Sequence, residues 1–152
     1  MVGNASWASS AAVARSMQGN RRRDTSPELA VRRIVFAHGL RYRVDYAPGP
    51  NKRRRADIVF TRLRLVFFID GCFWHGCELH SKPPRTNSDY WGPKLTRNIQ
   101  RDRETVEQLR EQGWTVYRYW EHEGPSAIAR AIILEVLTAS THAPAKPLAS
   151  RR

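Results

Sequence analysis

The chain has 152 residues, of which 41% are hydrophobic, so it is long enough for one domain with a proper core. Its 26 Lys and Arg residues outnumber 14 acidic residues and give a net charge of +12. Such an excess does not define a fold, but it favours an anionic partner, with nucleic acid first and an anionic membrane surface second. A merely soluble basic protein is the alternative.

The first twenty residues lack the charged start and continuous apolar stretch of a secretory signal. No run approaches the ~20 apolar residues of a membrane span. We therefore expect a cytoplasmic protein with no membrane partner. In that compartment a disulfide between Cys72 and Cys77 is disfavoured, whereas metal binding by the two cysteines is favoured.

In chain order, residues 1–22 are small, polar and then basic, which is typical of a flexible N-terminal arm. A helix is predicted to begin at Ser26, with Pro27 at its first helical position and Gly39 as its terminator. Residues 41–44 alternate between charged and hydrophobic side chains, a pattern typical of a short strand.

Two runs rich in β-branched and aromatic residues, 57–60 and 64–70, flank a short turn and predict a hairpin of central strands. Residues 81–93 are rich in Pro, Ser and Asn and indicate an ordered loop. A helix is predicted over 98–112, where apolar residues fall on one stripe before a glycine. The remaining segments are a strand over 114–120, a helix over 125–137 and a disordered basic tail over 139–152.

This order of elements describes a single α/β domain over residues 23–138, with a mixed central β-sheet flanked by helices. An all-parallel, doubly wound sheet fits poorly, because the hairpin requires an antiparallel pair of strands.

Two acidic residues mark the ends of the hairpin strands. Asp57 begins one strand and Asp70 ends the other, so in an antiparallel pair both carboxylates can meet at the same edge of the sheet. Two converging carboxylates repel each other unless a cation lies between them, and hard oxygen ligands suit Mg²⁺. The alternative is that each Asp simply ends a strand, where Asp is common.

Two further acids lie on predicted helices. Asp102 falls on the apolar stripe of its helix, between Ile99 and Val106, and an acid that faces the core needs a partner. Glu28 lies in the first turn of the first helix. For both residues, a favourable interaction with the helix dipole is the competing explanation.

The segment "DGCFWHGCELH", residues 70–80, contains both cysteines of the chain. Cys72, Cys77 and His80 have the spacing C-x4-C-x2-H, and His122 follows the strand that can return beside them. Four Cys and His ligands match a tetrahedral structural zinc site, although the spacing differs from the usual zinc finger.

Three other residues of this segment are candidates for contact with substrate. His75 lies too close to the cysteines to be the fourth zinc ligand, and an imidazole near an acidic metal edge is a candidate general base. Phe73 and Trp74 precede it, and they either pack in the core or wedge between base pairs. The basic run at 52–55 adds three candidate phosphate contacts, namely Arg53, Arg54 and Arg55.

Several stretches of the chain together resemble the very short patch repair endonucleases. The stretches are "RSMQGNRRRDTSPELAVRR", "RRRADIVF", "FFIDGCFWHGCELH", "NIQRDRE" and "GWTVYRYWEHE". The resemblance covers roughly residues 15–124. It implies a restriction-endonuclease-like fold and a bacterial protein of the cytoplasm or nucleoid, which we expect to act as a monomer. It also implies a Mg²⁺-dependent nick beside the T of a T:G mismatch, which arises when 5-methylcytosine deaminates.

The resemblance also implies residue roles. Asp57 would bind Mg²⁺ together with the backbone carbonyl of Ile69, His75 would be the general base, and Asp102 would polarise it. Glu28 matches an acid in the first helix of the family, with a less defined role. The remaining implied roles are a structural zinc site at Cys72, Cys77, His80 and His122, an aromatic wedge at Phe73 and Trp74, and an assisting contact from Met17 in the N-terminal arm.

Some positions depart from the family pattern. Some members have His in place of Asp70, so a metal role for Asp70 rests on the strand geometry alone. Some also have Cys in place of His122, which leaves open which histidines bind zinc. Two other functions remain as alternatives: a restriction-type nuclease that cuts matched sites, and a zinc-stabilised DNA-binding module without catalysis. Mismatch-repair proteins are further possible partners.

Overall fold

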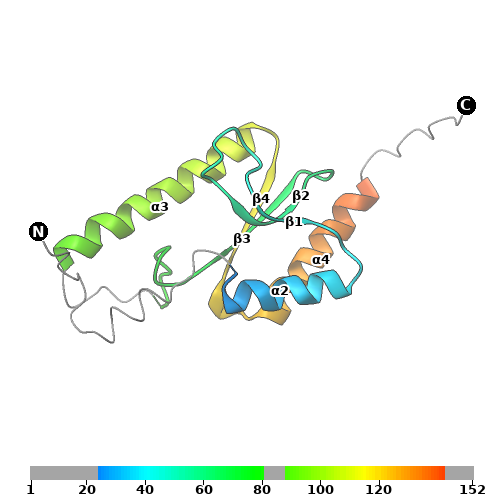
Figure 1. The fold of residues 1–152 in the computed structure, drawn as a ribbon, viewed down its shortest axis with the longest axis horizontal. Helices are drawn as coiled ribbons and strands as arrows, with labels where there is room; N and C mark the ends of the chain where they lie inside the picture. The colour runs from blue at the N-terminus through cyan, green and yellow to red at the C-terminus, as the bar shows by residue number, and fades with distance from the viewer. Residues whose placement is uncertain (1–23, 81–87, 143–152) are drawn as a thin grey trace, which may run out of the picture.

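The computed structural model describes residues 24–80 and 88–142 and shows three helices packed around one sheet (Figure 1). The elements are α2 (Ser26–Ala37), β1 (Arg43–Tyr46), β2 (Ala56–Phe60), β3 (Leu65–Asp70), α3 (Ser88–Glu111), β4 (Thr115–Trp120), the 3-10 turn η1 (Glu121–Glu123) and α4 (Pro125–His142).

The four strands form one mixed sheet in the order β1-β2-β3-β4. β1 pairs antiparallel with β2, β2 pairs antiparallel with β3, and β3 pairs parallel with β4. The predicted hairpin and mixed α/β sheet are therefore confirmed. Every residue of β3 is buried, as expected for a central strand covered on both faces.

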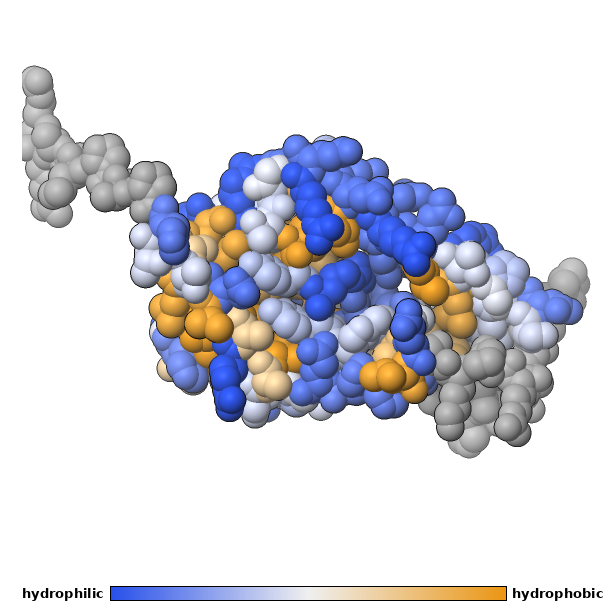
Figure 2. All heavy atoms as spheres, turned by 180° about the vertical axis from the view of Figure 1, so that it is seen from behind, coloured by the Kyte–Doolittle hydropathy of each residue, from blue (hydrophilic) through white to orange (hydrophobic). Residues whose placement is uncertain are grey.

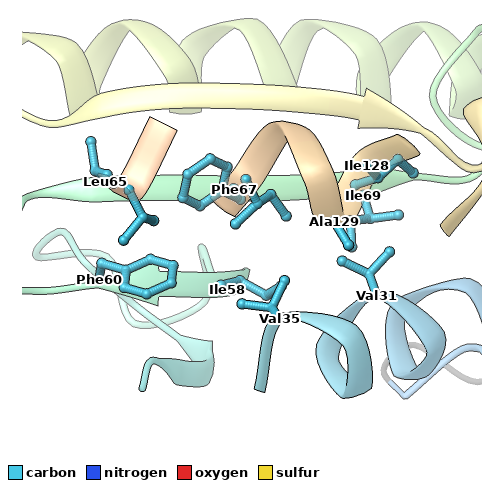
Figure 3. Packing of buried hydrophobic residues seen from close by; sticks show 11 residues of the cluster. Val31, Val35, Ile58, Phe60, Leu65, Phe67, Ile69, Ile128 and Ala129 are labelled. Atoms are coloured by element: carbon cyan, nitrogen blue, oxygen red, sulfur yellow. The ribbon is translucent and has the colours of Figure 1, made fainter. Parts of the chain in front are cut away.

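Helices cover both faces of the sheet: α2 and α4 lie together on one face, and α3 lies on the other (Figure 1). The larger core cluster joins α2 and α4 to alternate residues of β2 and β3, with Phe67 fully buried at its centre (Figure 3). The opposite cluster joins Leu109 of α3 to the other residues of the strands, including Phe68 and Val116. Burial on both faces fixes the direction of each side chain at the ends of β3 and β4.

The observed boundaries differ from the predicted ones by more than one residue in three elements. β1 begins two residues later than predicted, α3 begins at Ser88 rather than at residue 98, and α4 continues through residues 139–142, which we had assigned to the tail. α3 tolerates Pro93 in its second turn, at the cost of one backbone hydrogen bond. Trp91, which is 7% exposed, packs its ring against Phe73 and Trp74 and so anchors this added length.

The predicted arm at 1–22, with Met17, and residues 143–152 of the predicted tail lie outside the described residues. Within the part of the chain that the structure describes, none of the helices is both long and apolar enough to cross a membrane.

Candidate nuclease site

The start of β2 and the end of β3 form one edge of the sheet, as the hairpin geometry predicted. At this edge the Asp57 carboxylate accepts a hydrogen bond of 2.7 Å from the backbone N–H of Ile69. Burial raises the pKa of Asp57 from its ordinary value of 3.8 to about 7; the Ile69 N–H opposes this rise, and the charges of Glu28 and Asp70 add to it. A buried carboxyl that is costly to ionise among other acids fits a cation at this edge.

Glu28 is one of those acids, and it is 5% exposed in the first turn of α2. Its carboxylate accepts hydrogen bonds from the Asp24 backbone N–H (2.9 Å), the Thr25 hydroxyl (2.8 Å) and the Arg32 guanidinium (3.1 Å). Glu28 therefore has specific partners as well as a favourable place beside the helix dipole. Arg32, which also pairs with Asp24, offsets part of the negative charge near Asp57.

Asp70 is bound by an arginine that our sequence analysis did not single out. Arg118, in the middle of β4, donates two hydrogen bonds of 2.6 Å to the two carboxylate oxygens of Asp70. The charge of Asp70 acts on Asp57, but both oxygens of Asp70 already accept from a guanidinium. A fork of this kind is the strongest common arrangement of a carboxylate and an arginine.

His75 and Asp102 form the second part of the site. His75 comes from the loop after β3 and Asp102 from α3, and His75 Nδ1 lies 2.5 Å from Asp102 Oδ2. Burial lowers the pKa of His75, but the hydrogen bond to Asp102 and the charges of Asp70 and Asp102 outweigh burial, so the net pKa is raised. The same bond, helped by Arg118, overcomes the effect of burial on Asp102 and lowers its pKa. Since Nδ1 faces Asp102, Nε2 is the ring nitrogen left for a substrate proton.

The four predicted zinc ligands come together. The candidate ligand atoms of Cys72, Cys77, His80 and His122 all lie within 4.8 Å of one another. Cys72 Sγ lies 3.1 Å from His122 Nδ1, and Cys77 Sγ lies 3.7 Å from both His80 Nδ1 and His122 Nδ1. Two sulfurs and two imidazole nitrogens at such separations fit around one tetrahedral ion with bonds of about 2.0–2.3 Å. Burial and the neighbouring Cys77 raise the pKa of the Cys72 thiol, and a bound cation would favour its thiolate form.

Glu121 of η1 also holds this loop, since its carboxylate accepts a 2.8 Å hydrogen bond from the backbone N–H of Cys72. Phe73 and Trp74 follow Cys72 and are half-buried, with ring centroids 5.0 Å apart. Trp91 packs edge-on against both, and the Lys94 ammonium lies 5.9 Å from the Trp74 centroid and 5.1 Å from the Trp91 centroid. The sequence analysis missed Trp91 and Lys94, because the loop predicted over 81–93 hid the start of α3.

The basic run differs among its members. Arg53 is exposed. Arg54 Nη2 lies 3.9 Å from Glu104 Oε2 of α3, and Arg55 Nε lies 3.1 Å from Asp45 Oδ2. Much of the surface is hydrophilic, as Figure 2 shows for one face. A cavity of about 720 Å³ opens between α3 and the end of β4, and its walls include Asp70, His75, Asp102 and Arg118.

A carboxylate cluster beside a His–Asp pair, at the end of a mixed sheet in a basic α/β domain, is an arrangement suited to hydrolysis of phosphodiesters. Residues 9–81 match the family model described as "DNA mismatch endonuclease Vsr". The type II nicking enzyme V.NaeI of Lentzea aerocolonigenes is 46% identical over 78% of this chain and 73% of its own length. The type II nicking enzyme V.XorIIP of Xanthomonas oryzae pv. oryzae is 39% identical over 70% of this chain and 77% of its own length. The DNA mismatch endonuclease Vsr of Escherichia coli is 37% identical over 70% of this chain and 67% of its own length.

The chain therefore belongs to the Vsr family of DNA endonucleases, as the sequence resemblance predicted. It is a hydrolase that acts on DNA, and the family implies that the mixed α/β sheet is a variant of the restriction-endonuclease-like fold.

Proposed function

We propose that this endonuclease nicks one strand of double-stranded DNA beside the T of a T:G mismatch, in a Mg²⁺-dependent reaction of very short patch repair. The observation that carries the proposal is the His75–Asp102 pair beside Asp70, whose charge also acts on the buried Asp57 carboxyl, in a chain whose relatives are named mismatch endonuclease and nicking enzymes. A non-catalytic DNA-binding module would leave both features without a role.

Asp57 and the backbone carbonyl of Ile69 would hold Mg²⁺, since Asp70 is already bound by Arg118. When bound, the ion would polarise the scissile phosphate and stabilise the leaving oxygen. His75 would accept a proton from the attacking water at Nε2, and Asp102 would hold the ring in that orientation and stabilise its charged form. Glu28 would keep the start of α2 fixed beside Asp57 through its three hydrogen bonds.

Zinc bound by Cys72, Cys77, His80 and His122 would fix the loop that carries His75 and the two aromatic residues before it. Phe73 and Trp74 would enter the duplex at the mismatch, because a T:G wobble pair costs less to unstack than a matched pair. Contacts from Arg53, Arg54 and Arg55 to phosphates would add affinity that falls with salt.

The test is strand cleavage of one labelled duplex that carries a T:G mismatch, against the same duplex with a C:G pair, with and without Mg²⁺. We expect a Mg²⁺-dependent nick beside the mismatched T and none in the matched duplex. The Asp57→Asn variant should bind the mismatch without cutting it.

A second candidate is a nicking nuclease that also cuts matched sites. Several relatives are named type II nicking enzymes, a name that does not mention a mismatch. Equal cleavage of both duplexes would favour this candidate over mismatch repair.

A further inference from the structure

Arg118 occupies a central position in the site, and neither the family resemblance nor the named relatives assign it a role. It lies on β4 opposite Phe68 of β3, on the face covered by α3. Its guanidinium carbon lies 4.9 Å from the centre of the Phe68 ring, which restricts the side chain from one side. From there its nitrogens reach two acids: both oxygens of Asp70 at 2.6 Å, and Asp102 Oδ2 at 3.3 Å.

The two acids compete for the same imidazole nitrogen. His75 Nδ1 lies 2.5 Å from Asp102 Oδ2 and 3.7 Å from Asp70 Oδ1, so a small rotation of the ring would move it from one carboxylate to the other. In the structure, Asp70 Oδ1 is the oxygen that accepts from the Arg118 Nη2 group. Arg118 therefore binds the carboxylate of Asp70, which would otherwise compete with Asp102 for the hydrogen bond to His75 Nδ1.

We propose that Arg118 is a positioning residue for the endonuclease reaction. By binding both oxygens of Asp70, it leaves Asp102 as the hydrogen-bond partner of His75 Nδ1, and so directs His75 Nε2 toward the attacking water. The inference rests on the proposed roles of His75 and Asp102. A planar guanidinium can bind both oxygens of one carboxylate while its Nη2 faces the second, whereas the single ammonium of lysine cannot reproduce that geometry.

The same arrangement also affects the metal edge. With Asp70 bound by a cation, Asp57 is the carboxylate at this edge that remains for Mg²⁺. Without Arg118, Asp70 would be a buried and uncompensated charge close to both the metal edge and His75.

The experiment compares Arg118→Met, Arg118→Lys and the double variant Arg118→Met/Asp70→Asn in the zinc-loaded full chain. Two quantities are measured: the kcat and KM for nicking of T:G duplex, and the proton NMR resonance of the His75 Nδ1–H. We expect Arg118→Met to lower kcat about 10- to 100-fold with little change in KM, because the base is misdirected but present. The Nδ1–H resonance should shift in that variant.

The double variant is decisive, because Asp70→Asn removes the competing charge. It should recover most of the lost kcat and restore the wild-type Nδ1–H resonance, whereas Arg118→Lys should stay close to Arg118→Met. If Arg118→Met fails to fold, Arg118→Lys, which retains the charge, replaces it in the comparison. A wild-type kcat and an unshifted resonance in the single variants would overturn the inference, as would a double variant no better than Arg118→Met. If wild-type protein does not nick T:G duplex at all, the proposed function fails, and the resonance alone then tests the role of Arg118.

Discussion

Replacement of Asp57 by Asn should stabilise the protein in the absence of Mg²⁺ while abolishing cleavage. The Asp57 carboxyl is buried, and its pKa in the folded state is about 7, compared with its ordinary value of 3.8. In Mg²⁺-free buffer above pH 7 the folded protein must hold an ionised carboxylate that water would solvate better. Asn has the shape of the protonated acid, and its side-chain oxygen can still accept from the Ile69 N–H.

The sign and size of the effect follow from the pKa difference. A pKa that is raised on folding contributes stability below the unfolded-state value, and this contribution is lost as the pH rises through the folded-state value. The difference of about three pH units corresponds to a free energy of about 4 kcal/mol. The gain in unfolding free energy from Asp57→Asn should therefore be small at pH 4 and rise to at most about 4 kcal/mol near pH 8.

Urea denaturation, followed by tryptophan fluorescence at a series of pH values, measures this difference directly. Both proteins should be zinc-loaded and free of Mg²⁺ and chelators, so that the metal content is the same in both curves. Added Mg²⁺ should then stabilise the wild type more than the variant. A variant that is no more stable than the wild type at pH 8, or a difference that does not depend on pH, would refute a raised pKa of Asp57 as the cause.

Three further predictions address the loop after β3. His75→Ala should lower kcat about 10²- to 10⁴-fold while mismatch binding, measured by gel shift, stays near the wild-type value; full activity would exclude His75 as the base. Cys77→Ser should reduce zinc content from about one ion per chain toward none and lower the melting temperature, and an unchanged metal analysis would contradict the ligand set. Gly76→Ala should cost about 1–2 kcal/mol in urea denaturation, because its φ is +71° and a Cβ would lie 2.5 Å from Ile99 Cδ1. Gly92→Ala is the matched control, since a Cβ there meets nothing within 4 Å and alanine favours the helix; an equal loss in both variants would exclude the steric explanation.

Patterns local in the sequence predicted most of the fold and part of the site. The hairpin and its two acids followed from strand patterns, and the four Cys and His residues followed from composition and spacing. The start of α3 was not predicted, because "GP" at positions 92–93 indicates a loop. The packing of Trp91 on Phe73 and Trp74 helps to stabilise the helix there. Tertiary contacts of this kind override local propensity and leave no periodic signal.

Arg118 was missed for a different reason. In "TVYRYW" it alternates with Val116 and Trp120, and Val116 proved to face α3. The pattern therefore placed Arg118 on the same face as the acids, but the parallel register of β3 and β4 was needed to bring it within reach of Asp70. Strand pairing between distant segments cannot be deduced from a single amino-acid sequence. The available signal was a lone arginine inside an apolar strand, which requires a buried partner.

The proposals give His75 two independent means of positioning, and these can be separated by experiment. In the proposed mechanism, zinc bound by the Cys/His cluster would hold the backbone of the loop together with Glu121, and so would position Phe73 and Trp74 together with His75. Arg118, through Asp70 and Asp102, would act on the direction of the imidazole ring and on the charge at the metal edge. Loss of zinc should therefore weaken mismatch binding and catalysis together, whereas loss of Arg118 should reduce catalysis and leave binding intact. The loss of catalysis and the loss of mismatch binding should be measured in both Cys77→Ser and Arg118→Met. Comparison of the two variants then shows how much of the positioning of His75 comes from the loop backbone and how much from the ion pair.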